Sequence, residues 1–251
     1  MKIAIFANTG RAKVRKNLAV LKKLLKKAGI TVSSCHGALS ASNFDTAFVL
    51  GGDGWLLKTL REVYLKKVSV YFFPMGENTH NKGFKISDVP GIIKGTLKTV
   101  KYRPPYLQSS MTAFNDIVIK TGKVARTMKS KVTAGKRTIS SEGDGVIVAT
   151  PIGSSAYSLA AGGKILGLES RKTAVTPLVA FRGDSRGILA GQSQNITVKI
   201  LNKQGDVWEI ADGCLIKPAA MTTKITQKKA VCFIIFPQDK KDAESPSGLS
   251  V

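Results

Sequence analysis

Short apolar runs alternate with segments of helical periodicity over the first 74 residues, and this alternation restricts the fold more than any other feature of the chain. Leu18, Leu21 and Leu25 recur at the three- and four-residue spacing of one helical face. Strands that alternate with helices predict a parallel sheet covered by helices. The sequence therefore predicts a doubly wound α/β domain at the N-terminus. Its predicted strands are 3–7, 30–33, 47–50 and 68–74, and its predicted helices are 14–28 and 55–65.

Beyond Pro104-Pro105 the pattern changes to short β-rich runs separated by turn residues. We expect a second, mostly antiparallel domain that is β-sandwich-like. The expected limits are 1–100 for the α/β domain, 101–223 for the β-rich domain, 224–238 for an apolar run that returns to the first domain, and 239–251 for a loose tail. The predicted strands of the second domain are 108–113, 116–120, 128–134, 136–140, 146–149, 195–201 and 207–211.

Several common classes of protein are excluded by residue counts. No stretch of the 251 residues reaches the roughly 18 consecutive apolar residues of a membrane span, and the N-terminal strand lacks a cleavable signal pattern. We therefore expect a cytoplasmic protein without a membrane segment. The two histidines, His36 and His80, lie far apart, and the three cysteines have no metal-site spacing. These counts exclude a multi-histidine zinc site and argue against a histidine-based triad.

The formal net charge is +23, and a basic surface of this kind attracts polyanions. The lysines are dispersed along the chain and are not interleaved with aromatic residues. We therefore interpret the charge as a lysine-rich solvated surface. A nucleic-acid-binding protein is the least favoured function, because the sequence holds no recognisable nucleic-acid-binding motif.

A buried strand that ends in Gly51-Gly52-Asp53-Gly54 and continues as a helix predicts a phosphate site. Backbone N–H groups and a helix N-terminus both favour an anion at such a turn. Glycine permits close approach of the backbone, and a lone aspartate is able to bind Mg²⁺ or to take a proton from a hydroxyl. A tight turn with a surface aspartate is the alternative interpretation.

The segment 143–163 combines a strand, a Gly/Ser turn and a short helix of small residues. Ser154, Ser155, Tyr157 and Ser158 place hydroxyl groups around the predicted start of that helix. These hydroxyls suit a sugar, a base or a phosphate, whereas a capped helix packed through its alanines is the alternative. The missing histidine partner argues against a serine hydrolase.

Taken together and in this order, the two motifs resemble those of the NAD kinase family. The resemblance covers residues 3–212, and 144–163 is its most specific part. The loop Asn78-Thr79-His80-Asn81-Lys82-Gly83-Phe84 is similar to the Asn-x-Gly-x-Leu-Gly-Phe loop of the family, and Asn115-Asp116 is similar to its Asn-Glu pair. Further similar segments are 176–178, 181–182 and 211–213.

The resemblance implies a kinase that transfers a phosphoryl group from ATP or polyphosphate to the 2′-hydroxyl of the adenosine ribose of NAD, with a divalent metal that we expect to be Mg²⁺. It also implies a homo-oligomer, a dimer or tetramer, in which binding residues come from two chains. Asp53 is the implied base, Asn115 the adenine contact and Asp116 the contact to the ribose hydroxyls. No metal ligand is assigned. The candidate nucleotide-binding residues are Gly51, Gly52, Gly54, Lys58, Asn78, Asn115, Asp116, Arg126, Asp144, Ser155, Ala156, Tyr157, Ser158, Leu159, Ala160 and Asp212.

Three positions depart from the family pattern. His80 and Lys82 replace a glycine and a leucine of the loop, and Asp116 replaces a glutamate, which shortens its reach by one methylene. A catalytically weakened or inactive sensor that binds NAD or NADP is therefore the main alternative to an active kinase. A lipid-type kinase would share the Gly-Gly-Asp-Gly turn, but the segment 150–163 argues against it.

Overall fold

The computed structural model describes residues 1–34, 44–77, 79–122, 126–191 and 194–238. The chain divides into an N-terminal unit, Met1–Pro104 with the chain from Ala230, and a β-rich unit, Pro105–Lys229. The expected limits near residues 100 and 223 fall inside β5 (Thr99–Tyr102) and β18 (Thr222–Lys229). Each of these strands stays whole in one sheet, because its backbone hydrogen bonds are made there. The division therefore comes a few residues later than the sequence predicts.

The N-terminal unit contains a six-stranded sheet in the order β2-β1-β3-β4-β19-β5. The pairs from β2 through to β19 are parallel, and β5 runs antiparallel to β19. β19 is the expected C-terminal return, so this part of the fold prediction is confirmed. The strands are β1 (Ile3–Ala7), β2 (Val32–Ser34), β3 (Thr46–Gly51), β4 (Ser69–Pro74) and β19 (Phe233–Pro237), and the helices are α1 (Ala12–Lys27), α2 (Asp53–Val63), the 3-10 turn η1 (Ile86–Asp88) and α3 (Val89–Lys94).

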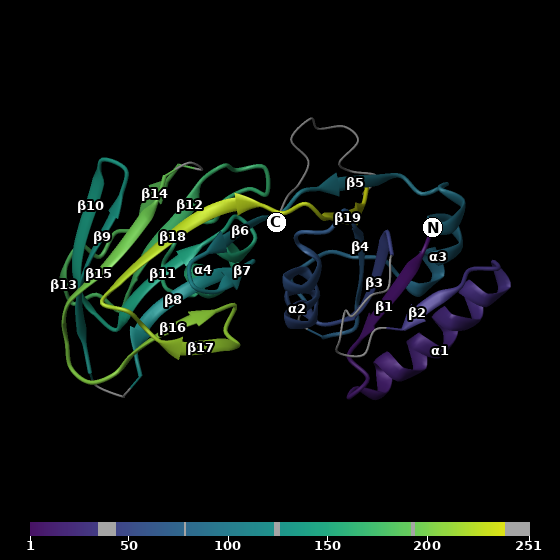
Figure 1. The fold of residues 1–251 in the computed structure, drawn as a ribbon, viewed down its shortest axis with the longest axis horizontal. Helices are drawn as coiled ribbons and strands as arrows, with labels where there is room; N and C mark the ends of the chain where they lie inside the picture. Colours follow the sequence, from purple (N-terminus) through teal and green to yellow (C-terminus); the bar gives the residue numbers. More distant parts are fainter. Residues whose placement is uncertain (35–43, 78, 123–125, 192–193, 239–251) are drawn as a thin grey trace. The chain divides into compact units, whose positions relative to one another are not determined.

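Helices cover both faces of this sheet, as the doubly wound prediction requires (Figure 1). Leu21 and Leu25 of α1 pack with Val89 and Ile92 of α3 in one hydrophobic cluster with the sheet. α2 lies on the other face and contacts β3. Because both faces are covered, all residues of β1 and β3 are buried, and neither strand alternates between buried and exposed positions.

The β-rich unit consists of a seven-stranded sheet, β13-β10-β9-β15-β18-β6-β7, and a six-stranded sheet, β14-β12-β11-β8-β16-β17. Neighbouring strands in both sheets pair antiparallel, which confirms the predicted β-rich fold. Its elements are β6 (Pro105–Gln108), β7 (Thr112–Ala113), β8 (Asp116–Thr121), β9 (Met128–Ala134), β10 (Arg137–Gly143), β11 (Gly145–Ala149), the 3-10 turn η2 (Gly153–Ser155), α4 (Tyr157–Ala160), β12 (Thr173–Leu178), β13 (Arg182–Gly183), β14 (Ile188–Ala190), β15 (Ile196–Lys203), β16 (Val207–Ala211) and β17 (Leu215–Pro218).

The core of the β-rich unit is formed by residues from both of its sheets. Ile117 of β8 and Val207 of β16 belong to one hydrophobic cluster with Val132 of β9 and Val198 of β15. Ile147 of β11 belongs to a second cluster, which includes Leu166 and lies on the other face of the six-stranded sheet. The six-stranded sheet is therefore covered on both faces in its central part.

One predicted strand of the second domain is wrong. The segment 108–113 forms two short strands, β6 and β7, which pair with each other through Leu107 and Ala113. The Ser109 N–H donates to the carbonyl of Met111 at 2.9 Å, and this turn interrupts the run.

Among the described residues, no helix is long and apolar enough to span a membrane.

Candidate functional site

The glycine-rich turn lies at the carboxyl end of β3, where α2 begins at Asp53. Gly52 is the N-cap residue of α2 and contributes no side-chain hydrogen bond. The N–H groups of the first turn of a helix have no partner within the helix, and the helix dipole makes this end attractive to an anion. The turn therefore has the local structure that the sequence predicts for a phosphate site.

The carboxylate of Asp53 is held by three hydrogen bonds from the loop that follows β4. It accepts from the backbone N–H of His80 at 2.8 Å, the backbone N–H of Asn81 at 3.2 Å and the Asn81 side-chain amide at 2.8 Å. A carboxylate has about four lone-pair positions, so one remains for a further donor. Asp53 is thus fixed in orientation and still able to accept from a hydroxyl group.

At His80, where this loop departs from the family pattern, the backbone makes the contact to Asp53. The side chains of His80 and Lys82 are exposed, and the contact from His80 to Asp53 is made by the backbone N–H. Replacement of the family glycine by histidine leaves this bond in place. Asn81 is a contact that the sequence analysis missed, because nothing local to it indicates that it turns toward a residue 28 positions earlier.

Close packing explains why position 51 requires glycine. A Cβ atom at Gly51 would lie 2.7 Å from the Cβ of Trp55, closer than two carbon atoms approach without displacement. Lys58, a predicted binding residue, places its Nζ 4.7 Å from the centre of the Trp55 ring. Lys58 is exposed, so its ammonium group is held over the indole and remains accessible to solvent.

Arg11 is a second residue that the sequence analysis did not select. It precedes α1, and a Cβ atom built at Gly76 would lie 3.8 Å from Arg11 Nη1 and 3.8 Å from the Cα of Gly52. The guanidinium thus lies close to Gly76, which follows β4 and is itself close to Gly52 after β3. In a parallel sheet, the loops after β1, β3 and β4 meet at the same edge, and a cation there complements a phosphate.

The β-rich unit contains a separate cleft of about 380 Å³. Its size lies within the range of small-molecule sites. Of the predicted binding residues, five line this cleft: Asn115, Asp116, Ala156, Tyr157 and Asp212. The cleft lies on the face of the six-stranded sheet that carries Val118, Ile210 and Ile216, which are neighbours in register on β8, β16 and β17.

Asp212 fixes the polar end of this cleft. Its backbone has a φ of 50°, a left-handed conformation that aspartate tolerates better than most residues. The carboxylate accepts from the backbone N–H of Phe114 at 2.9 Å and of Asn115 at 2.7 Å. Asp212 therefore holds the segment that presents Asn115 to the cleft.

Asn115 is supported by the chain on its other side. Its carbonyl accepts from the Thr150 N–H at 2.9 Å, and Thr150 Oγ1 donates to the Phe114 carbonyl at 2.6 Å. A Cβ atom at Gly153 would lie 2.0 Å from the Asn115 carbonyl oxygen, so only glycine permits this approach. The Oδ1 atom of Asn115 is buried and has no hydrogen-bond partner among the described residues. An unpaired buried acceptor in a cleft indicates a ligand donor.

Asp116 is a buried carboxyl group, with 5% of its surface exposed. Burial, and to a smaller extent the nearby charge of Asp212, raises the pKa of Asp116 to about 7. Two carboxyl groups that face one cleft disfavour each other's ionised form. Asp116 therefore changes its protonation state near neutral pH, whereas an exposed aspartate would remain ionised.

The remaining predicted residues of the β-rich unit do not all lie at this cleft. Asp116 pairs with Ala149 at one end of β11, and Asp144 precedes Gly145 at the other end. The carbonyls of Asp144 and Arg126 both accept from Thr121 Oγ1, at 3.4 and 3.0 Å, so these two residues belong to the other end of the sheet.

The hydroxyl-rich turn is mostly engaged within the protein. Ser158 is fully buried and shares a hydrogen bond of 2.9 Å with Thr176 Oγ1. Ser155 Oγ donates to the carbonyl of Ile152 at 3.1 Å. Leu159 and Ala160 are exposed on α4. The predicted residue Asn78 lies outside the described residues.

The comparison with protein families finds a match to the ATP-NAD kinase C-terminal domain over residues 114–225. An NAD kinase of Bacteroides fragilis is 31% identical over 266 residues, covering 92% of this chain and 90% of that protein. An NAD kinase of Symbiobacterium thermophilum is 31% identical over 186 residues, covering 67% of this chain and 64% of that protein.

Two solved structures share the fold. An NAD kinase from Archaeoglobus fulgidus, solved in complex with ATP, has a TM-score of 0.74 at 20% identity and covers 96% of this chain and 95% of its own. A yeast NADH kinase, solved with NADH, has a TM-score of 0.76 at 17% identity and covers 96% of this chain and 84% of its own. At these identities the likeness concerns the fold alone.

Proposed function

Because the chain belongs to the NAD kinase family, we propose that it transfers a phosphoryl group from ATP or polyphosphate to the 2′-hydroxyl of the adenosine ribose of NAD, giving NADP. The observation that carries this proposal for the chain's own residues is the Asp53 carboxylate. It lies at a glycine-rich helix N-terminus, and three donors fix its orientation. A hydroxyl acceptor needs a base of this kind.

Asp53 acts as the general base in this proposal. Its free lone pair accepts the proton of the 2′-hydroxyl as the oxygen attacks the terminal phosphorus of the donor, and the bond from that phosphorus to the leaving phosphate oxygen breaks. Phosphoryl transfer depends mainly on positioning and on electrostatic stabilisation. The N-terminus of α2 and the Arg11 guanidinium supply positive potential for the phosphates.

The cleft of the β-rich unit binds the adenosine part of NAD in this proposal. The buried Oδ1 of Asn115 accepts a hydrogen bond from the exocyclic amino group of adenine. Asp116, when ionised, accepts hydrogen bonds from the ribose hydroxyls, and the ring of Tyr157, which is 42% exposed, offers a face for stacking. Ile210 and Ile216 supply the apolar floor.

The residues at Asp53 also fit a divalent cation such as Mg²⁺. Among the described residues, no three His, Cys, Asp or Glu side chains are grouped to hold a metal. Mg²⁺ does not need such a group, because it is commonly held by one or two carboxylates together with substrate phosphates and waters. With the one free acceptor position of Asp53 occupied by the 2′-hydroxyl, the donor phosphates and waters would hold the cation, and the negative charge of the Asp53 carboxylate would attract it. The cation would neutralise charge that develops on the transferred phosphate.

Two further expectations stay predictions. A dimer or tetramer follows from the family resemblance, and sedimentation of the purified chain tests it directly. The cytoplasmic location likewise stays a prediction. The alternative function, an NAD or NADP sensor without turnover, is motivated by the substitutions at His80, Lys82 and Asp116.

Incubation of the purified chain with NAD, ATP and Mg²⁺, followed by detection of NADP with an NADP-specific dehydrogenase, tests the proposed function. We expect NADP to form with the native chain. Polyphosphate in place of ATP identifies the donor. Folded protein that binds NAD but forms no NADP with either donor or with any divalent metal would establish the sensor instead.

A further inference from the structure

The carboxylate of Glu209 is buried on the face of β16 that points away from the cleft. Val207 and Ala211, two residues to either side of it, belong to the core between the sheets. Ile210, which points to the opposite face, lines the cleft. Glu209 is 2% exposed. It therefore cannot touch a ligand in the cleft, although it lies on a strand that forms one of its walls.

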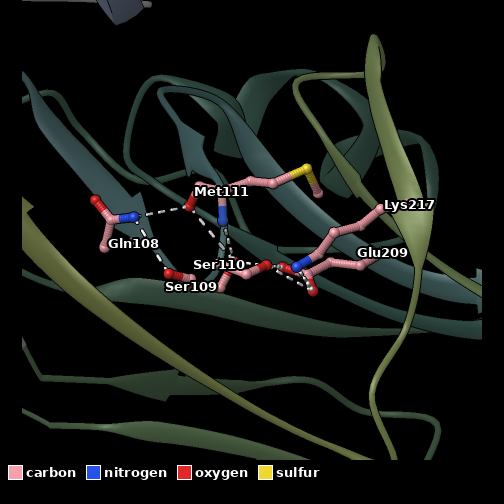
Figure 2. Close-up of polar contacts among 6 residues, drawn as sticks. All are labelled: Gln108, Ser109, Ser110, Met111, Glu209 and Lys217. Atoms are coloured by element: carbon pink, nitrogen blue, oxygen red, sulfur yellow. Dashed lines mark hydrogen bonds and ion pairs between the residues drawn. The ribbon is translucent and has the colours of Figure 1, made fainter.

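Three side chains converge on this carboxylate (Figure 2). Ser109 Oγ donates to Glu209 Oε1. Ser110 Oγ is 3.3 Å from each carboxylate oxygen, and Lys217 Nζ is 3.5 Å from Oε2. Lys217 lies directly opposite Glu209 on β17. The carboxylate thus joins β16 to β17 and to the turn between β6 and β7.

Stability alone does not account for this arrangement. Removing a carboxylate from water costs free energy, and an apolar side chain of similar volume serves a core position at least as well. A buried polar network that is fully hydrogen-bonded instead restricts the conformations of the segments that it joins. Glu209 is therefore explained better by what it holds in place than by what it adds to the core.

The segments held by Glu209 lead directly to the cleft. The turn at Ser109 and Ser110 precedes β7, which is followed at once by Phe114 and Asn115. Asp212, three residues after Glu209, accepts from the backbone N–H groups of both Phe114 and Asn115. One strand end thus holds the segment 109–115 at two points, at its start through Glu209 and at its end through Asp212.

The second partner of Glu209 leads to another wall of the cleft. Lys217 follows Ile216 on β17, and Ile216 lines the cleft beside Gly213. The ion pair between Lys217 and Glu209 fixes β17 against β16 on the core side. Loss of the carboxylate would therefore release both the approach to Asn115 and the hairpin that carries Ile216.

We propose that Glu209 is a positioning residue for the NAD-binding cleft, which sets the placement of Asn115 through Ser109 and Ser110 and the placement of Ile216 through Lys217. The inference rests on the proposed function, because it takes NAD as the ligand of the cleft. It concerns NAD binding and not the base at Asp53. A displaced cleft weakens the ground state and the transition state equally, so KM for NAD rises while kcat is retained.

Initial rates against NAD at saturating ATP test this in the full chain. For Glu209→Gln we expect KM for NAD to rise about tenfold, the size of one lost hydrogen bond to a charged group, with kcat within about twofold and KM for ATP unchanged. The Ser109→Ala/Ser110→Ala double variant should give the same pattern. Combining both sets should add little, because they remove one interaction. The matched control is Glu169→Gln, which removes an exposed carboxylate from the same unit and should leave KM for NAD unchanged.

A merely structural role gives a different result. A destabilised Glu209→Gln protein would lose kcat in proportion to its folded fraction at unchanged KM for NAD, and that result would overturn the inference. If Glu209→Gln does not fold, the serine double variant decides in the same way.

Calorimetric titration of NAD separates the positioning role of Glu209 from the proposed function. A native chain that binds NAD without forming NADP removes the proposed function, and a weaker binding constant in the variants still supports the positioning role. No NAD binding by the native chain overturns both.

Discussion

The carboxyl groups of Asp53 in the N-terminal unit and Asp116 in the β-rich unit occupy opposite kinds of environment. Asp53 stands at the start of a helix, half-buried, with three N–H groups directed at its oxygens. Asp116 begins a buried strand and faces a second carboxylate, Asp212, and burial raises its pKa to about 7. The surroundings thus fix the orientation of the aspartate side chain at position 53 and raise its pKa at position 116.

This difference assigns different tasks to the two units. A carboxylate held by donors has a fixed orientation and is suited to accept one particular proton. A buried carboxyl group beside a like charge is suited to respond to pH and to the hydroxyls of a ligand. We therefore expect changes in the N-terminal unit to lower kcat and changes in the β-rich cleft to raise KM for NAD.

Asp53→Asn carries the largest expected effect. The amide keeps the size of the side chain and one acceptor oxygen but cannot take up a proton from the ribose hydroxyl. We expect kcat to fall about a thousandfold, within the range found for loss of a general base. The melting temperature should also fall, because the new amide NH₂ faces an N–H donor that the carboxylate oxygen had accepted from. Steady-state rates of NADP formation measure this. A variant with more than a tenth of the native kcat would contradict the role of Asp53.

Gly153→Ala tests the cleft through its backbone. The new Cβ atom would meet the Asn115 carbonyl oxygen at 2.0 Å, and neither partner is a flexible side chain. We expect the free energy of unfolding to fall by about 3 kcal/mol, the upper end for overpacking, and KM for NAD to rise in the fraction that remains folded. Urea denaturation and initial rates measure the two effects.

The matched change in the N-terminal unit is Gly54→Ala. A Cβ atom at Gly54 would meet nothing within 4 Å, so the free energy of unfolding should change by less than about 1 kcal/mol. A loss as large as that of Gly153→Ala would show that free space around a glycine does not predict tolerance here.

The pH dependence of KM for NAD tests Asp116. Ribose hydroxyls are bound by its ionised form, whose fraction rises as pH passes through the raised pKa of about 7. We expect KM for NAD to fall about tenfold between roughly pH 6 and 8, because the apparent affinity scales with the competent fraction. In Asp116→Asn the dependence should be absent. An equally steep dependence in Asp116→Asn would assign it to another group.

The raised pKa of Asp116 also determines whether the free energy of unfolding rises or falls with pH. Between the ordinary aspartate pKa of 3.8 and about 7, the folded chain binds more protons at Asp116 than the unfolded chain does. The contribution of Asp116 to stability is therefore full at low pH and is lost as pH rises through this window, by at most about 1.4 kcal/mol per pH unit. Asp116→Asn should make the unfolding free energy less dependent on pH between 4 and 7.

Lys58→Met carries the smallest expected effect. Its Nζ lies over the Trp55 ring at an exposed position, and such contacts contribute about 0.5 to 1 kcal/mol. We expect the free energy of unfolding to fall by no more than this. An increase in KM for ATP or NAD well beyond tenfold would show that Lys58 contacts a nucleotide directly.

The parts of the fold that the sequence predicts are those set by local pattern. β3, the Gly51–Gly54 turn and α2 are contiguous, so one stretch of sequence contains the whole arrangement. β12 was not predicted, because all six of its residues are buried and the period-two alternation of a half-exposed strand is absent. The strand expected over 108–113 failed for a local reason, the side-chain and backbone bonds that close the turn at Ser109.

The residues of the candidate site likewise divide into those that a local motif indicates and those that only the fold brings together. Asp53, Asn115 and Asp212 were predicted as site residues because each belongs to a short motif. Asn81 and Arg11 were not, since their contacts join loops that only the parallel sheet brings to one edge. Glu209 was also missed. The one signal for it is an acidic residue at a position that alternates with core residues, between Val207 and Ala211.

The most direct test of Asp53 as the general base combines two measurements on one protein, Asp53→Asn. Calorimetric titration with NAD reports on binding, and the NADP assay with ATP and Mg²⁺ reports on the reaction. We expect native affinity for NAD together with an almost complete loss of NADP formation. Loss of NAD binding, or NADP formation at the native rate, would contradict the assignment of the chemistry to Asp53 and of NAD binding to the β-rich cleft.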